Sequence, residues 1–151
     1  MNSLAIPTAF PGIPNAISIG DLLVGGAPTK EHLHQAIAQG YTAFIDLRAN
    51  GETGVDEARD ALAQTDAQYQ HIPVAGAAGL TRENAQALDA ALAKTNGPTV
   101  VFCASGNRVG ALLALRAHWF RGASPEQALR IGREAGLTRM ASVVARQLSA
   151  S

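Results

Sequence analysis

The sequence has little cysteine, no excess of charge of either sign and no long hydrophobic run. A single cysteine, Cys103, excludes an internal disulfide and any zinc site built from several cysteines. Twelve basic residues balance twelve acidic ones, and because nucleic-acid-binding proteins normally have a basic excess, we expect no nucleic-acid partner. No apolar run approaches the roughly 18 residues of a membrane-spanning helix, so we expect no membrane span.

The composition predicts a globular chain with a hydrophobic core. Of the 151 residues, 47% are hydrophobic and 16% are charged. The proline-rich residues 1–15 are predicted to be a loose lead-in, and residues 16–151 a single domain. Residues 1–108 have a net charge of −4, whereas residues 109–151, with six arginines and two glutamates, have a net charge of +4. This basic third is either a set of solvated helix faces or a flank that attracts anions.

Glycine and proline positions, together with apolar periodicity, predict alternating strands and helices. This order predicts an α/β fold with a central, mostly parallel sheet of about four to five strands and helices on both faces. Ligands of such sheets bind beyond the carboxyl ends of the strands. Cys103 follows a predicted strand directly and precedes a helix, so we expect it at a ligand site. The predicted strands are 16–19, 22–24, 42–47, 69–74 and 99–102, and the predicted helices begin at or next to Thr29, Val55, Thr81, Arg108, Ser124 and Thr138.

The segment from Cys103 to Arg108 has the composition of an anion-binding loop. A strand that turns tightly into a helix directs several backbone N–H groups inward, and Gly106 permits the backbone conformation that this requires. The helix dipole adds positive potential, and Arg108 can hold two oxygens at once. The same field favours the thiolate of Cys103. We therefore expect Cys103 to be a nucleophile and Arg108, with the loop residues Ala104, Ser105, Gly106 and Asn107, to bind an oxyanion such as phosphate or sulfate.

This loop resembles the active loop of the cysteine-based protein tyrosine phosphatase superfamily, of the dual-specificity-like kind. More narrowly, the segments ISIGDLLVGGAPT, GYTAFIDLRANGE, HIPV and CASGNRVGALLAL resemble the beta-lactamase-hydrolase-like protein phosphatases, over roughly residues 13–148. The resemblance implies a phosphatase that needs no cofactor and acts on a phosphate monoester. By resemblance, Cys103 would attack phosphorus and become phosphocysteine, while Arg108 and the backbone of residues 104–108 would hold the phosphoryl oxygens.

Four features depart from the common phosphatase pattern. Four residues separate the cysteine from the arginine, where five are usual. Phe102 stands where histidine is usual, and Val109 where serine or threonine is usual. The loop Ala75–Gly79, which corresponds to the one that normally supplies the general acid, has no acidic residue. Turnover of substrates with good leaving groups would still be possible, because these need no proton.

Asp46 and Glu52 are the candidate substitutes for the missing acid. Asp46 ends a predicted strand that can neighbour the cysteine strand, and we expect it to be the catalytic acid; the alternative is a cap or a partner for Arg48. Glu52 lies in the following loop, where the alternative is a solvated acid. His71 lies within a strand and is expected to be structural.

Two other functions remain compatible with the sequence. A sulfurtransferase of the rhodanese type also places a cysteine at the start of a tight anion-binding loop, and Cys103 would then form a persulfide. A weakly active module that binds phosphorylated ligands would explain the departures from the phosphatase pattern. No metal site is expected, because His32 and His34 are on different faces of a helix. Substrate and oligomeric state stay open. We expect a soluble protein, cytoplasmic, or periplasmic if an export signal precedes this sequence.

Overall fold

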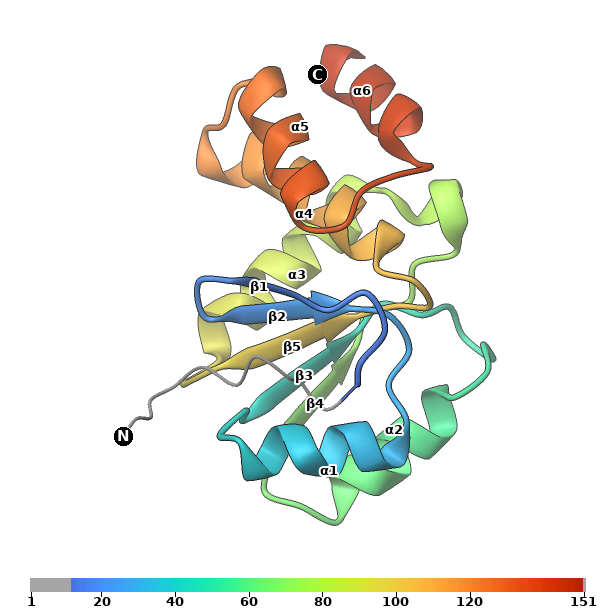
Figure 1. Cartoon of the computed structure of the whole chain (residues 1–151). Helices are drawn as coiled ribbons and strands as arrows, with labels where there is room; N and C mark the ends of the chain where they lie inside the picture. Colours follow the sequence, from blue (N-terminus) through green and yellow to red (C-terminus); the bar gives the residue numbers. More distant parts are fainter. Residues whose placement is uncertain (1–11, 151) are drawn as a thin grey trace.

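The computed structural model describes residues 12–150, which form a five-stranded sheet with helices on both faces (Figure 1). The strand order is β1-β2-β5-β3-β4. Only β1 is antiparallel to its neighbour among these strands, and the other pairs are parallel. The predicted fold class is therefore confirmed. The strands are β1 (Ile17–Ile19), β2 (Leu22–Gly25), β3 (Ala43–Asp46), β4 (Gln68–His71) and β5 (Thr99–Phe102).

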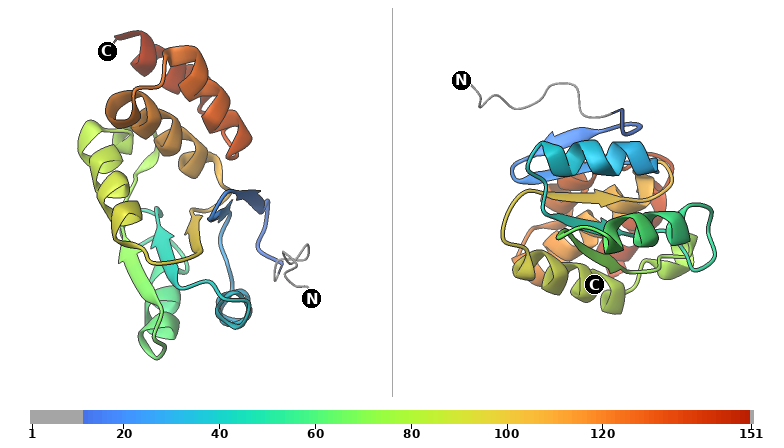
Figure 2. Two further views of the ribbon diagram at one scale, coloured as in Figure 1. Left: turned by 90° about the vertical axis from the view of Figure 1, so that its left-hand side faces the viewer. Right: turned by 90° about the horizontal axis from the view of Figure 1, so that it is seen from below.

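The helices form two layers of unequal thickness. Helices α1 and α2 cover one face of the sheet and α3 and α4 the other, while α5 and α6 pack outside α4, farther from the sheet (Figure 1, Figure 2). The helices are α1 (Lys30–Ala38), α2 (Val55–Ala63), α3 (Arg82–Lys94), α4 (Asn107–Arg121), α5 (Pro125–Glu134) and α6 (Ala141–Ala150), with a short 3₁₀ helix, η1, at Gly76–Gly79.

Helix starts follow the local chemistry of the sequence. The side chains of Thr29, Thr81 and Ser124 each accept a hydrogen bond from a backbone N–H of the first helical turn. Strand β4 ends at His71, earlier than predicted, because the regular ladder with β3 stops there: Arg48 N donates to the Asp46 side chain instead of to β4, and Val74 N donates to Leu47 O.

Strand β5 lies in the middle of the sheet and separates two hydrophobic cores. Its side chains are buried on both faces, as its wholly apolar sequence predicts. Because side chains alternate along a strand, Val100 and Phe102 contact the core beneath α1 and α2, whereas Val101 and Cys103 contact the core beneath α3 and α4. Cys103 therefore lies on the α4 side of the sheet, at the carboxyl end of β5.

The lead-in predicted for residues 1–15 falls mostly on residues 1–11, outside the described part of the chain. Its described end is packed rather than loose. Ile13 is buried, the Pro14 carbonyl accepts a hydrogen bond from Gly26 N at 2.8 Å, and Asn15 Nδ2 donates to Ser105 O at 2.9 Å. Across residues 12–150 we find no helix with the length and apolar character needed to cross a bilayer.

Candidate active site

The loop after β5 wraps around the sulfur of Cys103. Gly106, the residue before α4, has a φ of +96°, a conformation that L side chains rarely adopt. This turn directs the Gly106 N–H back to Cys103 Sγ, which accepts its hydrogen bond at 3.1 Å. Only 1% of the Cys103 surface is exposed, so the sulfur lies beneath the loop.

The loop presents a row of free backbone donors. The carbonyl groups of Ala104 and Ser105 accept hydrogen bonds from the segments behind the loop, namely from Ala27 N at 3.1 Å and from Asn15 Nδ2 at 2.9 Å. The first N–H groups of a helix have no partner within the helix and are a ready site for an anion. Within residues 12–150, the loop N–H groups without an acceptor are those of Ala104, Ser105, Asn107 and Arg108.

Arg108 is held beside this row by Glu52 and by a backbone carbonyl. Its Nη1 donates to Glu52 Oε1 at 2.8 Å and to Val74 O at 2.9 Å, and its Nη2 donates to Glu52 Oε2 at 2.7 Å. Two of the five guanidinium N–H groups, on Nε and Nη2, are left by these contacts. The hydrogen bonds to Glu52 raise the pKa of Arg108 by more than its partial burial lowers it.

Glu52 therefore neither is a solvated loop acid nor offers a free carboxyl group. Its hydrogen bonds with Arg108 lower its pKa, so it is ionised as the partner of the guanidinium. Its Oε1 also accepts a hydrogen bond from Ala49 N at 2.8 Å. The buried Arg48 closes the same loop, because its guanidinium donates to Thr53 O and to the next carbonyl, each at 3.1 Å. Glu52 is thus fixed by the loop that carries it.

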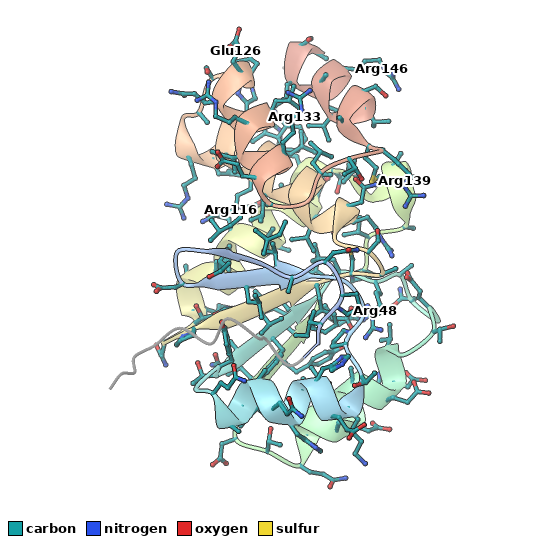
Figure 3. The ribbon with its side chains drawn as sticks, viewed as in Figure 1. Arg48, Arg116, Glu126, Arg133, Arg139 and Arg146 are labelled. Carbon is teal, nitrogen blue, oxygen red and sulfur yellow. The ribbon has the colours of Figure 1, made fainter. Side chains whose placement is uncertain are left out.

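Asp46 lies on the opposite side of the sheet from the cysteine. It is fully buried, and its two oxygens accept hydrogen bonds from Arg48 N at 3.0 Å, Nε at 2.9 Å and Nη2 at 2.9 Å, and from the Tyr69 hydroxyl at 2.9 Å. Its partner in β5 is Phe102, whose face it shares, and Figure 3 places Arg48 on the α1–α2 side of the sheet. Strand adjacency was predicted correctly, but alternation turns Asp46 away from Cys103. The placement supports the alternative, a partner for Arg48, and not a general acid.

A pocket of about 330 Å³ opens over the loop. Its lining residues include no carboxylate, and Cys103 is not among them. The loop without an acidic residue, Ala75–Gly79, reaches the pocket through Gly76. The sequence analysis predicted neither Arg139 nor Met140 at the site, although the positive net charge of residues 109–151 indicated a flank that attracts anions. A larger hollow of about 460 Å³ lies on α5, away from the cysteine, and has no convergent backbone donors. The pocket over the loop is lined by Gly76, Ala104, Ser105, Asn107, Arg108, Arg139 and Met140.

His32 and His71, two of the four histidines, have structural partners near the ends of their elements. His32 Nδ1 accepts a hydrogen bond from Thr29 N at 3.0 Å at the start of α1, and His71 Nε2 lies 2.6 Å from Arg48 O. In the part of the chain that the structure describes, no group of three or more His, Cys, Asp or Glu side chains could hold a metal ion.

Comparisons with known proteins agree with this geometry. Residues 19–118 match the family described as beta-lactamase hydrolase-like protein, phosphatase-like domain. Beta-lactamase hydrolase-like proteins of Xylella fastidiosa strains Temecula1 and 9a5c are 33% identical over 98 residues, which is 62% of this chain and 22% of each relative. The match thus spans about a fifth of the length of these curated relatives.

Solved structures with low sequence identity share the fold. A DUF442 protein from Shewanella putrefaciens CN-32 is 18% identical with a TM-score of 0.70, covering 92% of this chain and 91% of that one. The core catalytic domain of the PP-IP phosphatase SIW14 from S. cerevisiae, in complex with citrate, is 17% identical with a TM-score of 0.63, covering 91% and 85%. P. aeruginosa TpbA in complex with pTyr is 15% identical with a TM-score of 0.57, covering 90% and 96%.

The family match includes the whole loop from Cys103 to Arg108 and the strands that position it. The fold around that loop is the one found in cysteine-based phosphatases. The chain therefore belongs to the family of phosphatase-like domains of beta-lactamase hydrolase-like proteins.

Proposed function

We propose that this protein is a cysteine-dependent phosphatase of the dual-specificity-like kind that hydrolyses phosphate monoesters. The observation that supports this proposal is the convergence of three groups at one end of β5. These are the sulfur of Cys103, the row of free loop N–H groups and the guanidinium of Arg108. Such a set of preorganised donors stabilises the charge that develops on a transferring phosphoryl group.

The reaction would proceed in two displacements at phosphorus. The thiolate of Cys103 attacks phosphorus, the bond to the ester oxygen breaks, and a phosphocysteine forms. Water then attacks phosphorus, the P–S bond breaks, and the thiolate and inorganic phosphate are released. The free N–H groups of the loop and the two remaining N–H groups of Arg108 would hold the phosphoryl oxygens throughout, and Glu52 would keep the guanidinium in place.

The leaving group would depart without help from an acid. No carboxylate lines the pocket, Asp46 is buried on the other face of the sheet and Glu52 is paired with Arg108. General acid catalysis typically contributes about 10²–10⁴-fold, and it is needed only when the departing oxygen is basic. The proposed phosphatase would therefore act on aryl phosphates much faster than on alkyl phosphates.

The proposal is tested by two variants of the loop and one control. Cys103→Ser should abolish release of phosphate from an aryl phosphate but retain binding of orthophosphate, because the loop donors are backbone groups. Arg108→Ala should lose both activity and binding. Arg116→Ala is the matched control, since Arg116 lies on the same helix but pairs with Asp89 outside the pocket. Phosphate release that persists in Cys103→Ser would refute the proposal, and orthophosphate binding without turnover in the wild type would identify a binding module.

A rhodanese-type sulfurtransferase is the second candidate, favoured by the same absence of an acid. The thiolate of Cys103 attacks the outer sulfur of thiosulfate, which forms a persulfide and releases sulfite. This displacement needs no proton donor at the pocket. The short spacing between Cys103 and Arg108 also resembles that of rhodanese loops. Thiocyanate formed from thiosulfate and cyanide, measured in parallel with phosphate release on one preparation, decides between the two activities.

A further inference from the structure

A second arginine, Arg139, stands at the pocket without a partner. Arg116 and Arg121 of the basic third are both paired with Asp89. Arg139 is exposed and makes no ion pair or side-chain hydrogen bond with any residue in the range 12–150. Of the arginines after residue 108, it is the one that lines the pocket beside Arg108. Figure 3 shows it at the turn before α6, on the side of the sheet opposite to Arg48.

The anion loop itself positions the turn that carries this arginine. The carboxamide oxygen of Asn107, the residue before Arg108, accepts hydrogen bonds from Thr138 N at 2.8 Å and from Met140 N at 3.4 Å. The backbone is therefore held on both sides of Arg139. The approach is close at Gly136 as well, where a side chain would come within 3.1 Å of Gly106 O. The place of the second cation is thus tied to the loop and is not an accident of a loose surface segment.

Arg108 is paired with a carboxylate, whereas the positive charge of Arg139 is free to attract an anionic group of a ligand. Glu52 pairs with Arg108 through both carboxylate oxygens and offsets much of its charge, whereas Arg139 has no acidic neighbour in contact. The pocket lining contains these two guanidinium groups and no carboxylate. A ligand with one anionic group would use the loop and Arg108 and would leave Arg139 unused.

We propose that Arg139 binds a second anionic group of the substrate, beside the phosphoryl group held by the loop. This inference rests on the proposed function, because it takes the loop as the site of the reacting group. The substrate class is then a phosphorylated compound that has a further acidic group close to the reacting phosphate, such as a second phosphate or a carboxylate. Arg139 acts as a specificity determinant: it increases affinity for such compounds without contacting the reacting atoms.

The test compares two probes that have P–C bonds in place of P–O–C or P–O–P bonds, so the protein cannot hydrolyse them. Methylphosphonate presents one anionic group and methylenediphosphonate presents two. Their dissociation constants are measured by calorimetry for the wild type, Arg139→Gln, Arg139→Lys and the control Arg133→Gln, at about 0.15 M salt to screen distant charges. Arg133 is an exposed arginine of α5 that does not line the pocket. Circular dichroism confirms that each variant is folded.

We expect the wild type to prefer methylenediphosphonate. Arg139→Gln should weaken this probe roughly fivefold, the size of an exposed charged contact, and change methylphosphonate binding less than about twofold. Arg139→Lys should restore part of the preference, and Arg133→Gln should leave it unchanged. A ratio of the two constants that is the same in Arg139→Gln and the wild type overturns the inference. Absence of methylphosphonate binding in the wild type is a separate result that overturns the proposed function, and this inference with it.

Discussion

Replacing Asp46 with asparagine separates a structural role of this residue from a catalytic one. The carboxylate is fully buried and accepts three hydrogen bonds from Arg48 and one from the Tyr69 hydroxyl. Every one of these partners is a donor. In Asp46→Asn, one oxygen becomes an NH₂ group that faces donors, and the buried guanidinium of Arg48 loses its counter-ion.

The magnitude follows from the burial of this pair, whose side chains are 2% and 0% exposed. Removal of one partner of a buried ion pair costs about 3–5 kcal/mol, out of a total of roughly 5–15 kcal/mol for a domain. At about 2–4 °C per kcal/mol for a domain of this size, Tm should fall by roughly 6–20 °C. A surface aspartate provides the control: Asp56, 79% exposed, should tolerate the same substitution with a change below about 0.5 kcal/mol.

Urea unfolding followed by the fluorescence of Trp119 measures the loss of stability, and phosphate release from an aryl and an alkyl phosphate measures the catalytic effect. The structural role predicts a large loss of stability and an unchanged ratio between the two substrates in the protein that remains folded. Wild-type stability combined with a selective loss of alkyl phosphate turnover would refute this reasoning and identify Asp46 as a general acid.

Two further predictions concern the anion loop. Because Arg108 lowers the pKa of Glu52, their pairing stabilises the protein above the ordinary glutamate value of about 4.3, and this contribution is lost as the pH falls through the folded-state value. The difference in free energy of unfolding between the wild type and Glu52→Gln, on the order of 1 kcal/mol at neutral pH, should therefore decrease in acid; a difference independent of pH would contradict this. Gly106→Ala should lower the free energy of unfolding by about 1–2 kcal/mol and weaken orthophosphate binding, because its φ of +96° strains any side chain; unchanged binding in a calorimetric titration would show that the loop does not depend on this conformation.

The sequence by itself determined the parts of this protein that depend on neighbouring residues. Caps at Thr29 and Ser124 mark the starts of their helices, because a side-chain oxygen can reach an N–H group only two or three residues away. The wholly apolar strand that ends at Phe102 indicates burial on both faces. The run from Cys103 to Arg108 contains the complete chemistry of a strand-to-helix anion loop, so its place at the carboxyl end of β5 could be predicted.

Only the tertiary structure decided which charged groups meet. Asp46 and Glu52 are both acidic residues near one strand end, and their local sequence does not determine which of them reaches Arg108. The pleat of β3 turns Asp46 toward Tyr69, 23 residues away, while the following loop brings Glu52 to Arg108, 56 residues away. Arg139 reaches the same pocket because Asn107 holds the turn before α6 through hydrogen bonds that span 31 and 33 residues. Such pairings depend on how the layers pack, so they cannot be predicted from the spacing of residues along the chain.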